Sequence, residues 1–247
     1  NIYIRSLGNA PFIGKSCIFV DIPDVCSFIL DYGCAADSNY LKPVDLDKKF
    51  THGNRQVNPM YDSSFMFISH AHQDHAGGLA KTKFNKPIYS SKLTSQQHPQ
   101  AEPVNFYSKN YVNSNSFFII TPAGHIPGAA IFTFVCPRLT LAYTGDYELN
   151  ESFLLQRCQF PFEALNCDVF IAETTFSQII CRNEKYQQLQ HFQLLSLCHA
   201  AQRPCIHPVG SMGQAQLMAI QLNQFAQRLG QKNYELVTGQ VRQMMQL

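Results

Sequence analysis

The feature that most constrains the fold is a dense group of polar side chains directly after a short apolar run. Residues 65–68 (Phe-Met-Phe-Ile) are apolar and bounded by polar residues, so we expect a buried strand there. Residues 69–78 then read Ser-His-Ala-His-Gln-Asp-His-Ala-Gly-Gly. His70 and His72 are two residues apart, so on an extended backbone they point to the same side. One surface histidine needs no explanation, but three interleaved with Asp74 indicate a metal site.

Two more ligand-type residues follow apolar strands further along the chain. His125 lies in a Gly- and Pro-rich bend after the apolar run 117–121, and Asp146 follows the apolar run 139–144. Taken singly, each is better explained as an ordinary turn residue. Both repeat the pattern of the first cluster, however, and loops at one edge of a sheet can converge on one site.

The candidate ligands are too many for one tetrahedral ion and about right for two. Imidazole and carboxylate suit zinc best, with manganese as the other candidate. The sequence predicts a division of these residues between two divalent ions. The first ion takes His70, His72 and His125, the second takes Asp74 and His75, and Asp146 bridges the two.

Asp31 ends another expected strand, at residues 27–30. A carboxylate at the end of a buried strand is costly unless something uses it. Two interpretations are equally good: Asp31 caps a turn, or it accepts a hydrogen bond that orients a metal-bound histidine.

The remaining pattern predicts a mixed α/β chain. Residues 36–62 are polar and are expected to form a long loop, and residues 76–150 a mostly antiparallel meander with few helices. Short strands are also expected at 2–4, 16–20, 87–89, 104–106 and 130–136, and helices at 91–97, 183–201 and 212–229.

The composition is typical of a globular protein but does not indicate an activity. The 247 residues are 45% hydrophobic, and the net charge of +2 gives no overall signature of nucleic-acid binding, although a local basic groove would suffice. Nine scattered cysteines without a CxxC pair predict a reducing compartment, hence a cytoplasmic protein. No apolar run approaches the ~20 residues of a membrane span, so no membrane partner is expected.

The order of these motifs resembles a known family. His70-x-His72-x-Asp74-His75, followed by His125 and Asp146, is similar to the metallo-β-lactamase fold, an αββα sandwich. Residues 167–176 resemble the strand of β-CASP nucleases that ends in an acid followed by Ser/Thr-Thr. Residues 204–216 resemble their strand, loop and helix with a small-x-Gly-x-Ala-Gln pattern. Within that family, the chain is most similar to the bacterial ligase-associated DNA exonucleases or mRNA 3′-end-processing-like exonucleases.

The resemblance implies a domain organisation. Residues 1–176 would form the metallo-β-lactamase domain and residues 177–247 part of a β-CASP α/β insert. Family members continue with two further histidines and a return to the first domain, but no histidine follows Gln216. Because the chain also starts with Asn1 rather than Met, we expect a fragment that lacks the C-terminal return.

The resemblance also implies a reaction and partners. The expected activity is DNA exonuclease of the ligase-associated type, in which a hydroxide held by two divalent ions attacks phosphorus. Asp74 would orient the attacking water, and Glu173 would hold a downstream general-acid histidine. Ser211, with the amides after Gly210, would receive a substrate phosphate at a helix start. The expected partners are DNA or RNA, and a DNA ligase or helicase encoded nearby.

Three alternatives remain open. The first is an enzyme that processes RNA 3′ ends as an endonuclease or exonuclease. The second is a small-molecule hydrolase of the same fold, such as a thioesterase or lactonase. The resemblance of residues 173–175 and 213–216 to β-CASP nucleases argues against this alternative. The third is a non-catalytic scaffold subunit, which would be expected to have lost metal ligands.

Overall fold

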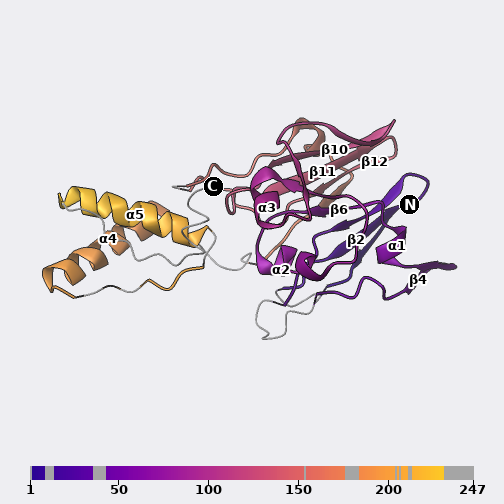
Figure 1. The fold of residues 1–247 in the computed structure, drawn as a ribbon. Helices are drawn as coiled ribbons and strands as arrows, with labels where there is room; N and C mark the ends of the chain where they lie inside the picture. Colours follow the sequence, from indigo (N-terminus) through magenta and orange to yellow (C-terminus); the bar gives the residue numbers. More distant parts are fainter. Residues whose placement is uncertain are drawn as a thin grey trace. The chain divides into compact units, whose positions relative to one another are not determined.

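The computed structural model describes residues 2–8, 14–35, 43–152, 154–175, 184–203, 205, 207–210 and 213–230. The chain forms two compact units. The first comprises residues 1–151 and 156–175, and the second comprises residues 152–155 and 176–247. In the described residues the first unit contains β-sheets and short helices, and the second contains two longer helices (Figure 1).

A six-stranded sheet in the first unit has the strand order β1-β2-β3-β6-β7-β8. Its strands are β1 (Tyr3–Ser6), β2 (Ile18–Ile22), β3 (Cys26–Leu30), β6 (Phe65–Ile68), β7 (Ile88–Ser91) and β8 (Glu102–Val104). β1, β2 and β3 are antiparallel, whereas β3, β6, β7 and β8 run parallel to one another. The carboxyl ends of β3, β6 and β7 therefore lie at one edge of this sheet, and so do the residues that follow them.

The prediction of an antiparallel meander over residues 76–150 is wrong for β7 and β8. Parallel strands need a crossover connection, and short helices supply it here. These helices are α2 (Gln73–Ala76), η1 (Leu79–Lys81) and α3 (Lys92–Gln97). Segments of four, three and six residues are too short to give a clear helical periodicity, so the sequence pattern does not reveal two of the three crossover helices.

The second sheet has five strands in the order β13-β12-β11-β10-β9. Its strands are β9 (Asn110–Asn113), β10 (Ser116–Pro122), β11 (Ala130–Cys136), β12 (Leu139–Tyr143) and β13 (Val169–Ile171). β9 to β12 are antiparallel, as predicted for β10 to β12, and β13 is parallel to β12. β9 was not predicted, because its Tyr and Val are flanked on both sides by asparagines, which are usually depleted in strands.

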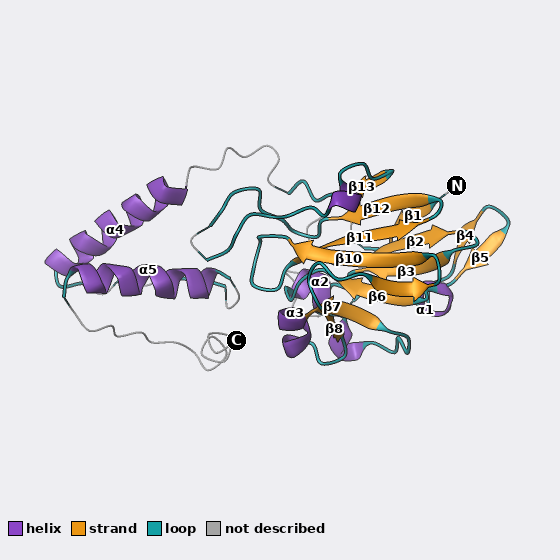
Figure 2. Cartoon of the chain, turned by 90° about the horizontal axis from the view of Figure 1, so that it is seen from above, coloured by secondary structure: helices purple, strands orange, loops and turns teal. Residues whose placement is uncertain are grey.

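The two sheets pack face to face (Figure 2). The core between them is rich in aromatic residues. Alternate residues of each strand point into it, for example Phe28, Phe67, Phe118, Phe132 and Phe134, all at most 1% exposed. A second apolar cluster lies on the other face of the six-stranded sheet, under α2 and η1. The short helix η2 (Phe162–Ala164) packs beside β11 and β12. This layering gives the unit an α/β sandwich architecture.

The prediction of a loop over residues 36–62 is wrong for its second half. Residues 50–57 form a hairpin of β4 (Phe50–His52) and β5 (Arg55–Val57), and helix α1 (Pro59–Asp62) follows. Val57 is fully buried, and Arg55 lies 3.6 Å from Asp21 and 3.4 Å from Asp62. Contacts with distant parts of the chain therefore stabilise a segment whose own composition is polar.

The described part of the second unit contains α4 (Glu184–Ala200) and α5 (Gln214–Arg228), close to the predicted helices. Phe192 and Phe225 pack with ring centroids 5.8 Å apart, and His191 Nδ1 lies 2.9 Å from Gln221 Oε1. That this unit is part of a β-CASP insert stays a prediction. Within the described ranges, no helix combines the length and the apolar character needed to span a bilayer.

Candidate metal centre

Three segments of the chain bring the predicted ligands to one edge of the sandwich. His70 and His72 follow β6, and Asp74 and His75 lie in α2, which comes directly after. The other two follow strands of the second sheet: His125 comes after β10, and Asp146 after β12. The site therefore depends on both sheets, because each sheet supplies part of the ligand set.

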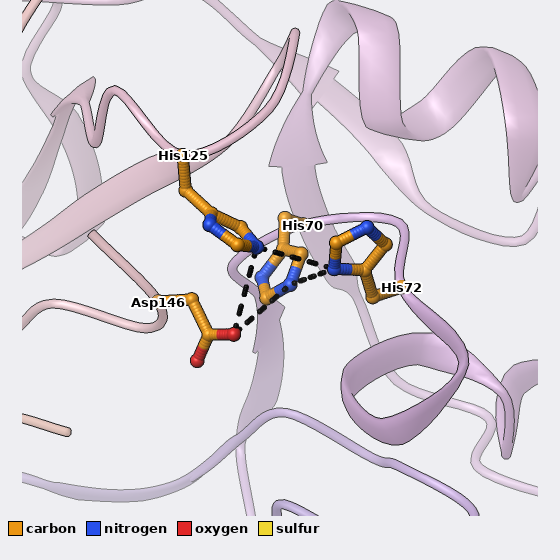
Figure 3. Close-up of side chains that lie close together, drawn as sticks. All are labelled: His70, His72, His125 and Asp146. Atoms are coloured by element: carbon orange, nitrogen blue, oxygen red, sulfur yellow. Dashed lines mark hydrogen bonds and ion pairs between the residues drawn. The ribbon is translucent and has the colours of Figure 1, made fainter. Parts of the chain in front are cut away.

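Four of these side chains point toward one another (Figure 3). One ligand atom from each of His70, His72, His125 and Asp146 lies within 4.8 Å of the other three. His72 Nδ1 is 3.1 Å from His70 Nε2 and 3.2 Å from His125 Nε2. Asp146 Oδ2 is 3.6 Å from His125 Nε2 and 3.9 Å from His70 Nε2. The edges of a tetrahedron around zinc would be about 3.3 Å for bonds of 2.0–2.1 Å, so this donor set fits a tetrahedral ion.

A second group of ligand atoms lies on the other side of Asp146. His75 Nε2 is 3.2 Å from Asp146 Oδ1 and 3.7 Å from Asp74 Oδ2. The two oxygens of Asp146 thus face different groups, Oδ2 toward the three histidines and Oδ1 toward His75. These distances are compatible with the predicted division between two ions that share Asp146, which stays a prediction. Binding of ions by these residues stays a prediction.

The carboxylate of Asp31 contacts the second group of ligand atoms through His75. It is fully buried, and its Oδ2 lies 2.7 Å from His75 Nδ1 and accepts hydrogen bonds from the hydroxyl groups of Ser69 at 2.8 Å and Tyr143 at 2.6 Å. Its Oδ1 accepts a hydrogen bond from Ser69 N at 2.7 Å. With Asp31 on Nδ1, the Nε2 lone pair of a neutral His75 faces Asp74 and Asp146. Of the two interpretations of Asp31, the geometry favours the orienting acceptor.

Backbone contacts set the position of α2 and hence of Asp74 and His75. The carbonyl oxygens of these two residues accept hydrogen bonds from Ser16 N and Tyr32 N, each at 2.8 Å. Gly33 lies against the backbone of Asp74, and a β-carbon added to Gly33 would be 1.6 Å from Asp74 O. Only glycine allows this approach, so the position of α2 requires a glycine at residue 33.

Burial and charge give the histidines opposite protonation preferences. Burial lowers the pKa of His70 well below 6.5, and the charge of His75 adds to this effect. Burial also lowers the pKa of His125, although Asp146 partly offsets it. For His75, burial opposes the proton, but Asp31 and Asp146 outweigh it and raise the pKa well above 6.5. Metal ligation needs neutral imidazoles, which His70 and His125 already supply.

Asp146 is kept ionised by the same contacts. Burial would raise the pKa of Asp146, but the hydrogen bond and the charge of His75 lower it below its ordinary value. A half-buried, ionised carboxylate with imidazoles on both sides is a suitable ligand for divalent cations.

The roles predicted for Glu173 and Ser211 stay predictions. Glu173 follows β13 on the side of the site, since its charge affects the pKa of His125, but its Oε2 accepts a hydrogen bond from Thr175 N at 2.6 Å. Ser211 lies outside the described residues. Sequence reasoning did not single out Tyr143. Its position two residues before Gly145-Asp146 is the only signal that could have found it.

Comparisons with known proteins agree with this geometry. No family model matches the chain. A protein of Methanocaldococcus jannaschii named "Probable RNase MJ4" is 25% identical over 251 residues, which cover 88% of this chain and 56% of that protein. Cleavage and polyadenylation specificity factor 73 of Drosophila melanogaster is 25% identical over 260 residues, or 91% of this chain and 36% of that one. Endoribonuclease YSH1 of Eremothecium gossypii is 25% identical over 184 residues, or 73% and 23%.

The chain is similar to β-CASP nucleases of the metallo-β-lactamase fold. That the sandwich of the first unit is a metallo-β-lactamase domain stays a prediction; its ligand-bearing loops lie at one edge. The chain spans about half, or less, of the length of the β-CASP relatives it matches. None of the three carries a name that refers to DNA ligation, so the finer resemblance to ligase-associated exonucleases stays a prediction.

Proposed function

We propose that this chain is the metal-binding part of a nuclease that hydrolyses phosphodiester bonds in RNA. The observation that carries the proposal is the arrangement around Asp146. Imidazole and carboxylate atoms from three separate segments lie around its two oxygens, in two groups that each suit a divalent ion. Zinc is the expected metal, because the donor set is rich in imidazole and one group is tetrahedral in outline.

In this proposal each residue has a defined task. His70, His72 and His125 would hold one ion, Asp74 and His75 would hold the second, and Asp146 would contribute to both. When bound, such ions lower the pKa of a water molecule to about 7 and offset the negative charge of the phosphate oxygens. Asp74, whose Oδ2 lies at the margin of the site, orients the attacking water by accepting a hydrogen bond from it.

Two acidic residues outside this set act on histidines. Asp31 keeps the proton on Nδ1 of His75, so that Nε2 is available to a ligand. Glu173 would hold a general-acid histidine of the nuclease. That task rests on the family resemblance, because the described contact of Glu173 is with Thr175 N.

RNA is the better-supported substrate. The names of the relatives refer to a ribonuclease, to cleavage and polyadenylation, and to an endoribonuclease. The alternative of an RNA-processing enzyme therefore has more support than the DNA exonuclease that the sequence first suggested. A DNA ligase or helicase partner and a cytoplasmic location have no support beyond the sequence-based expectation.

A direct test compares labelled single-stranded RNA and DNA of the same sequence as substrates of the gene product, with zinc or manganese added. We expect cleavage of RNA, and the fragment pattern distinguishes exonuclease from endonuclease. His72→Ala should lower the rate more than about a hundredfold. It removes the proposed ligand whose Nδ1 lies within 3.2 Å of both His70 Nε2 and His125 Nε2. His52→Ala, a histidine of the β4–β5 hairpin outside the site, is the matched control.

The other outcomes are equally informative. Degradation of the DNA with intact RNA would favour the DNA exonuclease. Turnover of thioesters or lactones with both oligonucleotides intact would favour a small-molecule hydrolase. Absence of bound zinc or manganese in the purified gene product, together with no cleavage, would favour a scaffold.

A further inference from the structure

Helix α3 (Lys92–Gln97) and the residues at its ends contact both loops that carry the histidines, and the centre described above does not include it. Three polar side chains at its ends are Ser91, Thr94 and His98. Ser91 and Thr94 are fully buried although both are hydroxyl residues. Buried hydroxyl groups need hydrogen-bond partners, so their partners show what the helix holds.

The N-terminal end of α3 contacts the His125 loop. The Ser91 hydroxyl donates a hydrogen bond to Gly128 O at 2.5 Å, and the Thr94 hydroxyl lies 3.2 Å from the same oxygen. Ser91 Oγ also accepts a hydrogen bond from Thr94 N and so caps the helix. The loop is closed at its base by hydrogen bonds from Ala123 N to Ala129 O and from Ala129 N to Ile126 O. A displacement of Gly128 would therefore be transmitted to His125.

The C-terminal end of α3 contacts the His70–His72 loop. His98 Nε2 lies 3.4 Å from Ala71 O. Because a carbonyl oxygen can only accept, Nε2 is the donor in this contact. Ala71 separates the two histidine ligands, so its carbonyl orientation is coupled to the direction in which both rings point. The backbone of His98 is itself held, with N donating to Thr94 O and O accepting from Ala101 N.

We propose that α3 acts as a positioning helix that sets the separation of the two histidine loops. Ser91 and Thr94 hold one loop through Gly128 O, and His98 holds the other through Ala71 O. The distance that it sets is the 3.2 Å between His125 Nε2 and His72 Nδ1, one of the contacts that join ligands from the two sheets. This inference rests on the proposed metal binding, since the helix acts on the ligands and touches no substrate.

Zinc affinity, measured by competition with a chelator at a temperature where every variant is fully folded, tests this proposal. We expect Ser91→Ala and His98→Ala each to weaken zinc binding about tenfold, the lower range for residues that orient ligands. Thr94→Val should have a smaller effect in the same direction, because it keeps the Ser91 cap. His98→Gln should restore much of the affinity, since the glutamine amide can still donate to Ala71 O.

Ser95→Ala is the matched control for the helix. Ser95 is buried on α3 as well, but its hydroxyl donates to Lys92 O at 2.9 Å within the helix. Its replacement should leave zinc affinity unchanged while it removes the same chemical group. The pair Ser91→Ala and Ser95→Ala thus separates positioning of the loops from general weakening of α3.

A second measurement needs no metal. In the metal-free protein, amide hydrogen exchange of residues 70–72 and 123–130 should be faster in Ser91→Ala and His98→Ala than in wild type, and unchanged in Ser95→Ala. If wild type binds no zinc, the proposed function fails, and the exchange data alone decide the role of α3. If wild type binds zinc but Ser91→Ala and His98→Ala match it in affinity and exchange, the positioning role is wrong while the proposed function stands.

Discussion

Asp31 shows how one buried carboxylate can organise a whole site. Its backbone is left-handed, with φ +61, a conformation that costs an ordinary L-residue about 1–2 kcal/mol. Ser69, His75 and Tyr143 all contact its carboxylate oxygens. These contacts join β3, β6, α2 and β12, so the charge is held from both sheets.

Replacement of Asp31 by Asn tests this residue at little cost to the backbone, since Asn tolerates left-handed φ values. The variant loses the charge opposite His75, so we expect affinity for one of two zinc ions to fall about 10–100-fold while the other is retained. Calorimetric titration with zinc measures both sites. Asp21→Asn is the control, because Asp21 is also buried and accepts a hydrogen bond from Ser27 Oγ at 2.6 Å outside the centre. Equal affinities in both variants would contradict the orienting role of Asp31.

The raised pKa of His75 makes metal binding depend on pH. Asp31 and Asp146 overcome burial and keep His75 protonated in the metal-free protein at neutral pH. An ion that takes Nε2 must displace that proton, so apparent affinity should rise with pH until the raised pKa of His75 is passed. Zinc titrations at pH 7 in buffers of different ionisation enthalpy should report proton release. No release at pH 7 would show that His75 does not exchange a proton for the ion.

At the scale of elements, backbone hydrogen bonds from neighbouring segments hold helix α2 in place. It has four residues, and the carbonyl oxygens of Asp74 and His75 accept hydrogen bonds from Ser16 N and Tyr32 N. An isolated helix of this length would not be stable in water. The geometry of Asp74 and His75 is therefore imposed by the neighbouring segments.

Gly33→Ala should break this arrangement. The new β-carbon would lie 1.6 Å from Asp74 O, so either α2 or the Tyr32–Cys34 segment has to move. We expect a loss of about 3 kcal/mol in the free energy of unfolding, as for strong overpacking. Gly210→Ala is the control, because the nearest atom to its added β-carbon is a side-chain oxygen at 3.5 Å. Urea unfolding measures both, and equal stability of Gly33→Ala and wild type would refute the close approach.

At the scale of the molecule, the sandwich interface determines whether the ligands meet. Phe132 is fully buried, and its ring centroid lies 4.6 Å from that of Phe67 and 5.2 Å from that of Phe118. Its strand, β11, begins in the loop that carries His125. Packing of the two sheets therefore also brings the ligands that follow their strands close together.

Phe132→Ala should cost about 3–5 kcal/mol of unfolding free energy, the range for phenylalanine truncation in a core. Zinc affinity should also fall, because loss of this ring weakens the packing between the two sheets that carry the ligands. Phe170→Ala is the control on β13, since this ring is 54% exposed, and its effect should stay within about 0.5 kcal/mol. Thermal unfolding with and without zinc measures both. A Phe132→Ala protein that keeps wild-type affinity would contradict the dependence of the site on the interface.

The sequence by itself determined the candidate ligands, the two long helices and the family resemblance. Ligand identity and spacing are local chemical facts, and α4 and α5 are long enough to show helical periodicity. Other features were decided only by tertiary structure: the parallel order of β6, β7 and β8, the choice between two interpretations of Asp31, and the contacts of Tyr143 and α3. Each of these depends on contacts between residues far apart in the chain. Four-residue strands and helices have too little local preference to specify such contacts until the two sheets pack.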